Sequence, residues 1–272
     1  MARSQLTYFS FGGVSTSSYS IVVDSSDTLV KPSRDIERIV VPGRSGGLTV
    51  DNGRFNDIVV TYHCRVTENL DSNYNGFLAA LHALGGERKL RDDRMDSYFT
   101  GTYNGKTSPG CYRMAVLDSS VQAENSYGGF CGDFDISFTC KPQMWLNVGD
   151  VGIEVAQGGS VRIYNPTKFP SKPLLQLYGK GTGTTDSTLA KFAISGDKGG
   201  TIGVNSQSPY SYLFVDCDIE DAYNGAANCN KYIKATNGVF PECGASTSGF
   251  VASVTSPGSG ARMVIYPRWW TV

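Results

Sequence analysis

The chain has 272 residues, which is enough for two domains of ordinary size, each with its own core. Its 24 basic and 25 acidic residues leave a formal net charge of −1, which excludes an overall field that steers the chain toward nucleic acid or an anionic membrane. Charged residues make up only 18%, while 32 glycines and 15 tyrosines favour a mainly β protein with tight turns and large contact surfaces over a helical enzyme.

No apolar run approaches the roughly 18 residues of a membrane span, and residues 1–5 carry no apolar signal segment, so we expect synthesis in a reducing cytoplasm and no membrane insertion. The seven cysteines form no C-x-x-C pair, and most lie in strand-like runs where a thiol acts as a small buried hydrophobe. A zinc site built from Cys217, Cys229 and Cys243 is a weak alternative, because the spacing fits no familiar zinc pattern.

Strands are expected over residues 6–11 and 19–23, and the next stretch, residues 34–53, is the most distinctive of the chain. Residues 36–41 are rich in β-branched side chains, and residues 48–50 form a second, shorter run.

Turn-forming residues separate and close these two runs. Pro42-Gly43 suits a type II turn, and Asp51-Asn52-Gly53 is a turn signal that closes the second run. We therefore expect an exposed hairpin arm near residues 36–53, with Arg44 at its tip, that reaches a neighbouring molecule.

The rest of the N-terminal half contains further strands and one helix. Strands are expected over residues 57–66, 111–117 and 130–140. His63 lies on the more polar face of the first of these strands, where a hydrogen-bonded surface role is favoured over a catalytic one.

The expected helix is capped by Asn73 or Asn75, has a stripe made of Phe77, Leu78, Leu81 and Leu84, and ends at Gly85-Gly86. The mixed-sign run at residues 87–94 is interpreted as a solvated turn with local ion pairs. The alternative is that Arg88, Arg91, Asp92 and Asp93 pair across a subunit boundary.

A domain boundary is expected between residues 147 and 159, which gives domains of residues 1–148 and 149–272. Beyond it, short apolar runs among glycine, serine and threonine predict a β-sandwich. Its strands are expected over residues 161–164, 174–178, 191–195, 201–204, 212–216, 232–235, 249–254 and 261–266.

Chemical motifs are weak. Residues 179–184 contain a G-x-G that fits a β-turn better than an anion site, because no helix pattern follows. The cluster of Asp216, Asp218, Glu220 and Asp221 could bind calcium or act as a glycosidase pair, but it lacks the register of an EF-hand. Trp269 and Trp270, or Tyr210 and Tyr212, could stack on a sugar. We assign no catalytic, metal-binding or cofactor-binding residue and expect no cofactor.

Two sets of short motifs resemble those of the distal tail proteins of phages with long, non-contractile tails and of related prophages. The N-terminal set is Arg34-Asp35, Val41-Pro42-Gly43-Arg44-x-Gly46 and Asp51-Asn52-Gly53. The C-terminal set is Asn165-Pro166, Pro173-x-x-x-Leu177-Tyr178-Gly179-x-Gly181 and Pro267-Arg268-Trp269-Trp270, with Lys141-Pro142 and Trp145-Leu146 at the passage between domains. One departure lies near Thr167, where the family pattern leads us to expect a glycine.

The resemblance implies a mainly β fold with one helix: an N-terminal domain that forms a six-membered ring, and a C-terminal galectin-like β-sandwich. It implies a structural role as the hub that joins the tail tube to the tail-tip protein and often to receptor-binding proteins, with DNA passing through the channel without specific binding. The chain would be made in the bacterial host cytoplasm and reside in the virion, and its motif residues would serve assembly. A carbohydrate-binding module in host recognition is the alternative function, and a glycan-degrading enzyme is the third.

Overall fold

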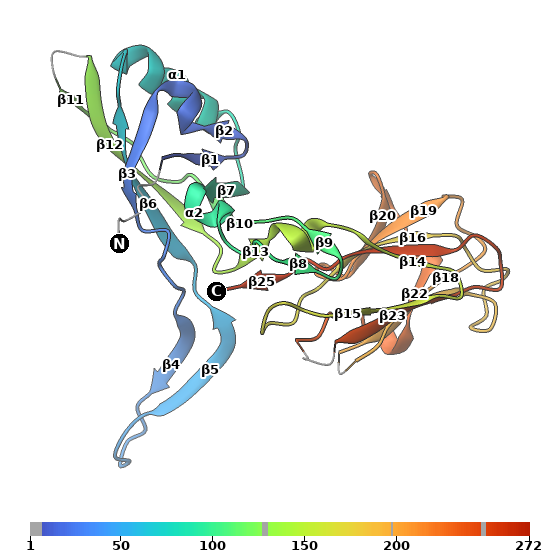
Figure 1. The fold of residues 1–272 in the computed structure, drawn as a ribbon. Coiled ribbons are helices and arrows are strands. Elements are labelled where there is room, and N and C mark those ends of the chain that lie inside the picture. The colour runs from blue at the N-terminus through green and yellow to red at the C-terminus, as the bar shows by residue number, and fades with distance from the viewer. Residues whose placement is uncertain (1–6, 127–129, 197, 246–248) are drawn as a thin grey trace. The chain divides into compact units, whose positions relative to one another are not determined.

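The computed structural model describes residues 7–126, 130–196, 198–245 and 249–272. They form two compact units, one built from residues up to Tyr98, Gly110–Met144 and Val272, and the other from Phe99–Pro109 and Trp145–Thr271 (Figure 1). Leu6, at the start of the first expected strand, lies outside the described residues. The boundary expected at residue 148 stays a prediction.

The first unit is built on an antiparallel sheet. Its strand order is β2 (Val14–Ser15), β1 (Phe9–Phe11), β7 (Arg88–Asp92), β10 (Cys111–Val116), β12 (Cys131–Cys140), β6 (Ile58–Val66) and β3 (Ile21–Ser26), with β11 (Ala123–Ser126) pairing on β12. The long β6–β12 pair runs from Ile58 opposite Cys140 to Val66 opposite Gly132. Because side chains alternate, the pair turns one row of apolar residues inward and a polar row outward.

The inward row packs against the helix α1 (Leu70–His82) and the short 3₁₀ helix η1 (Thr16–Tyr19). Four aromatic rings form the centre of this core: Phe9 stacks on Tyr62 with a centroid distance of 4.4 Å, and Phe77 and Phe138 meet Phe9 edge-on. These rings fill the space between the helix and the sheet.

Two sequence predictions for the helix and for the charged run after it are wrong. Helix α1 begins at Leu70, not near Asn73 or Asn75. Leu70 is buried in the core, and Asn69 before it adopts the left-handed conformation, which asparagine tolerates, at the N-terminus of the helix. Residues 87–94 are not a solvated turn: residues 88–92 form β7, inside the sheet, and residues 93–96 form a one-turn helix, α2 (Asp93–Asp96). The expected exit at Gly85-Gly86 is confirmed, since both glycines have positive φ.

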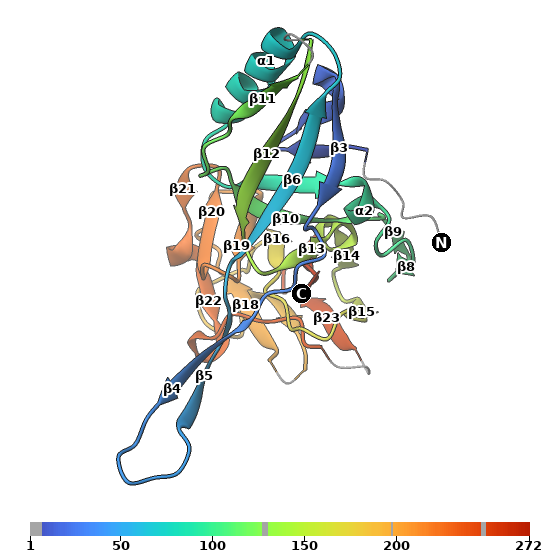
Figure 2. The ribbon, with the colours of Figure 1, turned by 90° about the vertical axis from the view of Figure 1, so that its left-hand side faces the viewer.

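The hairpin arm forms a separate two-stranded sheet of β4 (Arg34–Ile39) and β5 (Leu48–Phe55). Figure 2 shows the arm extending away from the sheet of its own unit. The expected turn at Asp51-Asn52-Gly53 is wrong, because β5 continues through these residues to Phe55.

The second unit contains two antiparallel sheets whose inward side chains form a shared core. The first has the order β14 (Ile153–Ala156), β24 (Arg262–Tyr266), β16 (Leu174–Tyr178), β19 (Tyr212–Asp216), β20 (Asp221–Asn224) and β21 (Ala227–Asn228). The second has the order β15 (Ser160–Ile163), β23 (Phe250–Thr255), β17 (Ala190–Ile194), β18 (Gly200–Val204) and β22 (Ile233–Ala235). Every strand expected for the sandwich is present, while β14, β20 and β21 were not anticipated.

Short elements complete the second unit. β13 (Met144–Leu146) pairs with β25 (Trp270–Thr271), and β8 (Thr102–Tyr103) forms a small hairpin with β9 (Lys106–Thr107). The 3₁₀ helices are η3 (Asn147–Asp150), η4 (Asn230–Tyr232) and η5 (Thr236–Gly238). Asn104, in the turn of the β8–β9 hairpin, exchanges two hydrogen bonds with Tyr164. These bonds attach the hairpin to the rest of the second unit.

Candidate interaction site

The tip of the arm is a tight turn. The N–H of Arg44 donates to the carbonyl oxygen of Val41 at 3.2 Å, and Gly43 has φ of +79°. Proline in the second position and a glycine with positive φ in the third define a type II turn, which confirms the turn expected at Pro42-Gly43. Gly46 also has positive φ, at +84°. The glycines therefore give the tip a backbone that holds Arg44 out into solvent.

The base of the arm is a β-bulge built from the N-terminal family-like motif. Arg34 lies opposite Phe55 and Ile36 opposite Asp51, so Asp35 alone faces the three residues 52–54 of the partner strand. The side chain of Asp51 accepts a hydrogen bond from the N–H of Gly53 at 2.8 Å, and Gly53 has φ of +71°. This bulge has an Asp side chain bonded to a backbone N–H two residues on and a glycine with positive φ, two features that are also common in turns. The sequence pattern therefore suggested a chain reversal here.

Two ion pairs cross this base. Arg34 Nη1 lies 3.2 Å from Asp51 Oδ2, and Arg54 Nε donates to Asp35 Oδ2 at 2.6 Å. The hydrogen bond from Arg54 holds the pKa of Asp35 below its usual value. The guanidinium of Arg34 also lies 5.0 Å from the centre of the Phe55 ring. Arg34, Asp35, Asp51 and Gly53 thus act together to fix the base of the arm.

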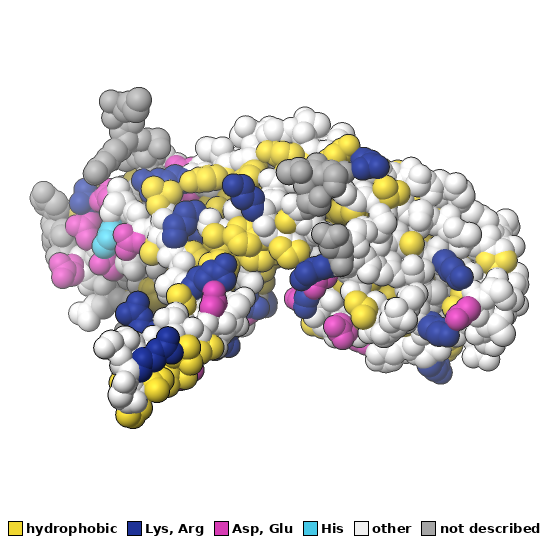
Figure 3. All heavy atoms as spheres, turned by 90° about the horizontal axis from the view of Figure 1, so that it is seen from below, with side chains coloured by type: hydrophobic (Ala, Val, Ile, Leu, Met, Phe, Trp, Pro, Cys, Tyr) yellow, Lys and Arg dark blue, Asp and Glu magenta, His cyan; other side chains and the backbone are white. Residues whose placement is uncertain are grey.

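Beyond its base, the arm exposes apolar side chains. The register places Ile39 opposite Leu48 and Glu37 opposite Val50, so these four side chains share one face. Ile39 is 41% exposed, Leu48 44% and Val50 36%. Figure 3 shows hydrophobic side chains along the arm next to basic ones. We call Ile39, Leu48 and Val50 the apolar face of the arm.

An exposed apolar face of this kind is unfavourable in an isolated molecule. Burying such surface yields about 25 cal/mol per Å², and contiguous exposed patches on soluble proteins usually mark interaction sites. An isolated two-stranded hairpin is at best marginally stable and leaves both strand edges unpaired. The arm therefore has both the surface and the free backbone groups to bind another protein.

The C-terminal family-like motif is built into the core of the second unit. Trp269 is 1% exposed and packs against Phe250. The carbonyl oxygen of Pro267 accepts a hydrogen bond from Ser171 Oγ at 2.6 Å, and the N–H of Arg268 donates to Gly149 at 2.9 Å. A Cβ on Gly149 would lie 2.4 Å from the backbone nitrogen of Trp269, so only glycine fits there.

The remaining motif residues are also structural. Gly179 has φ of +86°, and a Cβ on Gly181 would lie 2.1 Å from the carbonyl oxygen of Thr188. The carbonyl oxygen of Pro173 accepts from the N–H of Cys217. Thr167, near which a glycine was expected, does not have positive φ. Asn165 Oδ1 accepts hydrogen bonds from both the N–H and the hydroxyl of Thr167.

The acidic cluster around residue 216 is neutralised in part by neighbouring cations. Both guanidinium nitrogens Nη1 and Nη2 of Arg268 donate to the carboxylate of Asp216, at 2.7 and 2.8 Å. Burial acts to raise the pKa of Asp216, but these hydrogen bonds and those from backbone N–H groups lower it on balance. Asp218 lies 3.5 Å from Lys172 Nζ. In the part of the chain that the structure describes, no group of three or more His, Cys, Asp or Glu is placed to hold a metal ion.

The side chains considered for sugar stacking are largely occupied. Trp269 is buried, and Trp270 stacks on Phe169 at a centroid distance of 4.4 Å while its Nε1 donates to the carbonyl oxygen of Pro170. Tyr210 meets Tyr232 edge-on, and Tyr212 packs against Tyr178 and Phe214. The two tryptophans therefore serve packing within the unit.

The histidine and cysteine candidates have structural surroundings. His63 lies on the outward face of β6, and its Nδ1 is 2.6 Å from Asp135 Oδ1 across the strand pair. Cys217, Cys229 and Cys243 are buried free thiols, and burial raises the pKa of each. These thiols are small core residues with little thiolate character.

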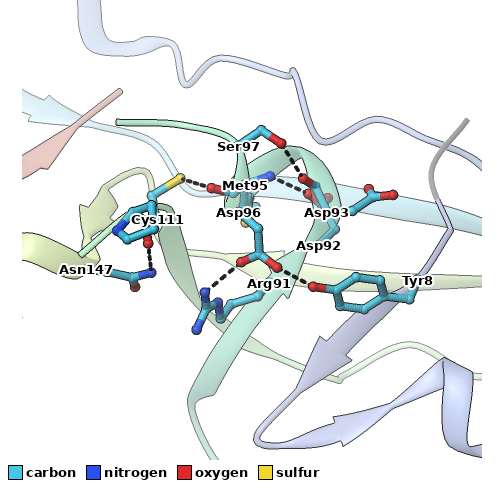
Figure 4. Close-up of polar contacts among 10 residues, drawn as sticks. Tyr8, Arg91, Asp92, Asp93, Met95, Asp96, Ser97, Cys111 and Asn147 are labelled. Atoms are coloured by element: carbon cyan, nitrogen blue, oxygen red, sulfur yellow. Dashed lines mark hydrogen bonds and ion pairs between the residues drawn. The ribbon is translucent and has the colours of Figure 1, made fainter. Parts of the chain in front are cut away.

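One buried charge in the first unit was missed by the sequence pattern. Asp92 is fully buried, and its Oδ2 accepts from Thr28 Oγ1 at 2.6 Å and from Tyr62 OH at 3.1 Å. Its Oδ1 accepts from the N–H of Met95 and so caps α2 (Figure 4). Desolvation raises the pKa of Asp92, and the hydrogen bonds only partly oppose it. Asp92 therefore joins three segments of its own unit and is not free to pair across a subunit boundary.

The neighbouring charges of the same run are paired locally. Asp96 accepts from Arg91 Nη2 at 2.6 Å and from the hydroxyl of Tyr8, and that hydrogen bond raises the pKa of Tyr8 to about 12 (Figure 4). Asp93 Oδ2 accepts from the N–H and hydroxyl of Thr7, while Arg88 donates to the carbonyl oxygen of Leu84. A local ion pair was expected in this run, although its strand conformation was not.

Comparison with known proteins gives the class of fold. No protein-family model and no curated protein matches the sequence. Among solved structures, the chain is similar to those of phage hub and baseplate proteins, and the similarity extends over both units. The expected mainly β fold class is therefore confirmed. One helix was expected, and the structure adds a second, one-turn helix, α2.

Two particular structures carry this finding. The SPP1 Dit (gp 19.1) protein, described as a paradigm of the hub adsorption apparatus in phages that infect Gram-positive bacteria, is 12% identical, with a TM-score of 0.62, and the match covers 95% of this chain and 97% of that one. A chain of the phage P2 baseplate in its activated conformation with calcium is 10% identical, with a TM-score of 0.52, and the match covers 96% and 97%. At these identities the similarity establishes a shared fold.

Proposed function

We propose that this chain is a structural component of a phage tail tip, where copies of it assemble into a ring that acts as a hub. The observation that carries the proposal is the exposed apolar face of the arm, formed by Ile39, Leu48 and Val50, on a chain whose fold matches the SPP1 hub protein along nearly its whole length. An arm fixed at its base and apolar beyond it has the properties of an assembly element.

Ring formation sets physical requirements that the arm helps to meet. A closed ring needs a heterologous interface, in which one patch of each copy contacts a different patch of the next copy. A stable interface buries at least about 1,000 Å². The arm supplies apolar side chains, two free strand edges and the exposed cation of Arg44 to one side of such an interface.

The partners follow from this role. We infer a six-membered ring that binds the tail tube protein on one side and a tail-tip protein on the other, with receptor-binding proteins as further partners. DNA would pass through the channel without specific binding, and the site of action would be the virion. Among the described residues, no helix is long and apolar enough to cross a membrane. The second unit would be the galectin-like sandwich that projects from the ring.

A structural role also agrees with the state of the candidate reactive groups. Asp216 is paired with Arg268, the tryptophans are packed, and the thiols are buried. The structures with a similar fold belong to hub and baseplate proteins. The residues that resemble the family motif would act in assembly and in shaping the two units: Arg34, Asp35, Val41, Pro42, Gly43, Arg44, Gly46, Asp51 and Gly53 in the arm, and Pro173, Tyr178, Gly179, Gly181, Pro267, Arg268, Trp269 and Trp270 in the second unit.

The test is the mass of the purified protein by multi-angle light scattering, with arm variants. Arg44→Glu and a deletion of residues 43–47 should weaken the ring without changing the unfolding temperature of the monomer. Lys168→Glu is the matched control, because Lys168 is an exposed cation in the second unit. If the wild-type protein and both arm variants had equal masses, the arm would have no role in assembly.

A further inference from the structure

A hollow with apolar walls lies on the first unit, beside the short helix α2. Its volume is about 390 Å³, and it is lined by Leu29, Asp93, Arg94, Ser97 and Tyr98. We call these five residues the α2 hollow. Leu29 is 57% exposed and Tyr98 is exposed as well, so the core of the unit leaves two large apolar side chains at its border. A cavity of about 150 Å³ holds a benzene ring, so the α2 hollow has room for two branched aliphatic side chains.

Hydrogen bonds fix the backbone on both sides of the α2 hollow. Next to Leu29, the hydroxyl of Thr28 donates to the buried carboxylate of Asp92 at 2.6 Å. At the end of α2, the N–H of Tyr98 donates to the carbonyl oxygen of Met95 at 3.3 Å. A surface that is already ordered loses less conformational freedom when it binds a partner. The α2 hollow is therefore preorganised, although its apolar walls face solvent in the single chain.

Arg94 supplies the available charge of the α2 hollow. Among the described residues, its guanidinium makes no ion pair and donates no hydrogen bond. The other charged residue of the lining, Asp93, is occupied: its Oδ2 accepts from the N–H and the hydroxyl of Thr7, and its Oδ1 is buried. The α2 hollow therefore suits a partner that brings aliphatic side chains together with one carboxylate.

The apolar face of the arm has this composition. Ile39, Leu48 and Val50 are exposed, and Glu37, opposite Val50, points to the same side. Glu37 is itself exposed and makes no ion pair with a described residue. Figures 1 and 2 show α2 beside the sheet of the first unit and the arm extending away from that sheet. An α2 hollow that receives the apolar face of the arm therefore belongs to another copy of the chain.

The spacing of the complementary groups is similar on the two surfaces. Glu37 and Ile39 are two residues apart on β4, which places them about 7 Å apart on one face of the strand. Arg94 and Tyr98 are four residues apart across the turn of α2 and its helical cap, which makes them neighbours about 6 Å apart. When Glu37 lies at Arg94, Ile39 therefore reaches the apolar walls of the hollow.

We propose that the apolar face of the arm of one copy binds in the α2 hollow of the next copy, an inference that rests on the proposed ring and names its second patch. A heterologous ring interface requires two different, complementary patches on one chain. Both patches lie on the first unit, so the second unit stays free to project from the ring. Contact between the aliphatic side chains of the arm and the walls of the hollow removes apolar surface from water. The pair of Glu37 with Arg94 sets the direction of the arm, since a reversed arm would leave both charges unpaired.

A charge placed in the α2 hollow tests the apolar contact. Leu29→Asp should raise the concentration needed for ring formation by roughly tenfold or more, because the carboxylate would be buried among apolar side chains. The unfolding temperature of the monomer should not change, since Leu29 is exposed there. Ile219→Asp is the matched control, because Ile219 is an exposed branched side chain of the second unit, and it should leave assembly unchanged. Rings that form equally well with Leu29→Asp and with the wild type would overturn the contact.

A charge exchange tests the direction of the arm. Glu37→Arg and Arg94→Glu should each raise the concentration needed for ring formation by roughly tenfold, because each places like charges together. The protein with both substitutions should assemble at nearly the wild-type concentration. Glu37→Arg with Lys168→Glu is the matched control, since Lys168 is an exposed cation of the second unit, and it should restore nothing. Equal recovery in both double variants, or recovery in neither, would overturn the pairing of Glu37 with Arg94.

Cross-linking tests the same contact by position. In a Leu29→Cys, Ile39→Cys protein, mild oxidation should give disulfide-linked oligomers on a non-reducing gel. Leu29→Cys with Arg38→Cys is the control, because Arg38 lies on the opposite face of the arm and both proteins carry the same native thiols, and it should stay monomeric on the gel. If rings form but neither pair cross-links and Leu29→Asp has no effect, the α2 hollow is not the acceptor and the proposed hub function stands. If neither the wild-type protein nor any variant forms a ring, the hub function fails together with the contact.

Discussion

Arg268 binds Asp216 through two parallel hydrogen bonds, from Nη1 to Oδ1 at 2.7 Å and from Nη2 to Oδ2 at 2.8 Å. The pair joins the C-terminal motif to the end of β19, and both side chains are mostly shielded from solvent, with exposures of 29% and 12%. The arginine also has φ of +53°, a conformation that asparagine tolerates better than most residues. The contact therefore anchors the end of the chain to the sandwich.

Loss of this pair should destabilise the second unit. Arg268→Asn keeps the backbone conformation and removes the two charge-assisted hydrogen bonds, so we expect a loss of about 2 kcal/mol in the free energy of unfolding. Urea denaturation at pH 7 measures it. In the wild-type protein the folded-state pKa of Asp216 is lowered, so its contribution is present above the unfolded pKa near 4 and is lost as pH falls through the folded value. An Arg268→Asn protein as stable as the wild type would contradict this account.

The pH dependence of stability expected from Asp92 has the opposite sign to that from Asp216. Desolvation raises its folded-state pKa, so the folded state binds the proton more tightly, and the stabilising contribution of that proton is lost as pH rises from the unfolded pKa through the folded value. Asp92→Ala should cost roughly 3 kcal/mol at pH 7, because Thr28, Tyr62 and the N–H of Met95 all lose their acceptor. Asp92→Asn, the control, keeps an acceptor oxygen and should cost less and remove this pH dependence. If Asp92→Ala and Asp92→Asn lost the same unfolding free energy, the hydrogen bonds to Asp92 would not be the source of its contribution to stability.

The base of the arm should loosen in acid. The hydrogen bond from Arg54 lowers the pKa of Asp35, so the contact is complete above the unfolded pKa near 4 and disappears as pH falls through the folded value. Heteronuclear NOE values for the amides of residues 36–50 should fall over that range. Asp35→Asn should show the loosened state already at pH 7, with little change in overall stability. Arm amides with the same NOE in both proteins would rule out this ionic anchor.

The apolar face of the arm should matter for assembly and little for folding. Leu48→Asp adds a charge to a residue that is 44% exposed in the single chain, so the unfolding free energy should change by less than about 0.5 kcal/mol. In a ring the same carboxylate would be buried without a partner, so assembly should be abolished. Val239→Asp is the control, at a residue that is 54% exposed in the second unit. Sedimentation velocity of the three proteins gives the result, and intact rings for Leu48→Asp would refute the role of this face.

Much of the fold follows from alternation in the sequence. Leu174–Tyr178 and Tyr212–Asp216 have the predicted bounds, because inward apolar and outward residues alternate along the first strand and along the second as far as Val215. Residues 88–92 do not show this pattern, since the inward-facing residues are Leu90 and the carboxylate Asp92. Burial of Asp92 depends on Thr28 and Tyr62, which are distant in sequence and cannot be assigned as its partners from a local pattern.

In the candidate interaction site, too, some features follow from the local sequence and others depend on residues that are distant in sequence. The type II turn at Pro42-Gly43 is a local property, because proline fixes φ and glycine accepts positive φ. The bulge opposite Asp35 depends on cross-strand register, so the signal of Asp51-Asn52-Gly53 correctly indicated unusual backbone but not its position inside a strand. The outward positions of Tyr212 and Phe214 could have been found from their alternation with Leu213 and Val215, but their proximity to Tyr178 and Tyr223 requires the order of the strands.

The mass of the purified wild-type chain over a range of concentrations tests the central claim most directly. Mass photometry and light scattering should show a species of six chains, and negative-stain images of it should show a closed ring with a central opening. A chain that stays monomeric at every concentration, with the same mass as the protein lacking residues 43–47, would contradict the account.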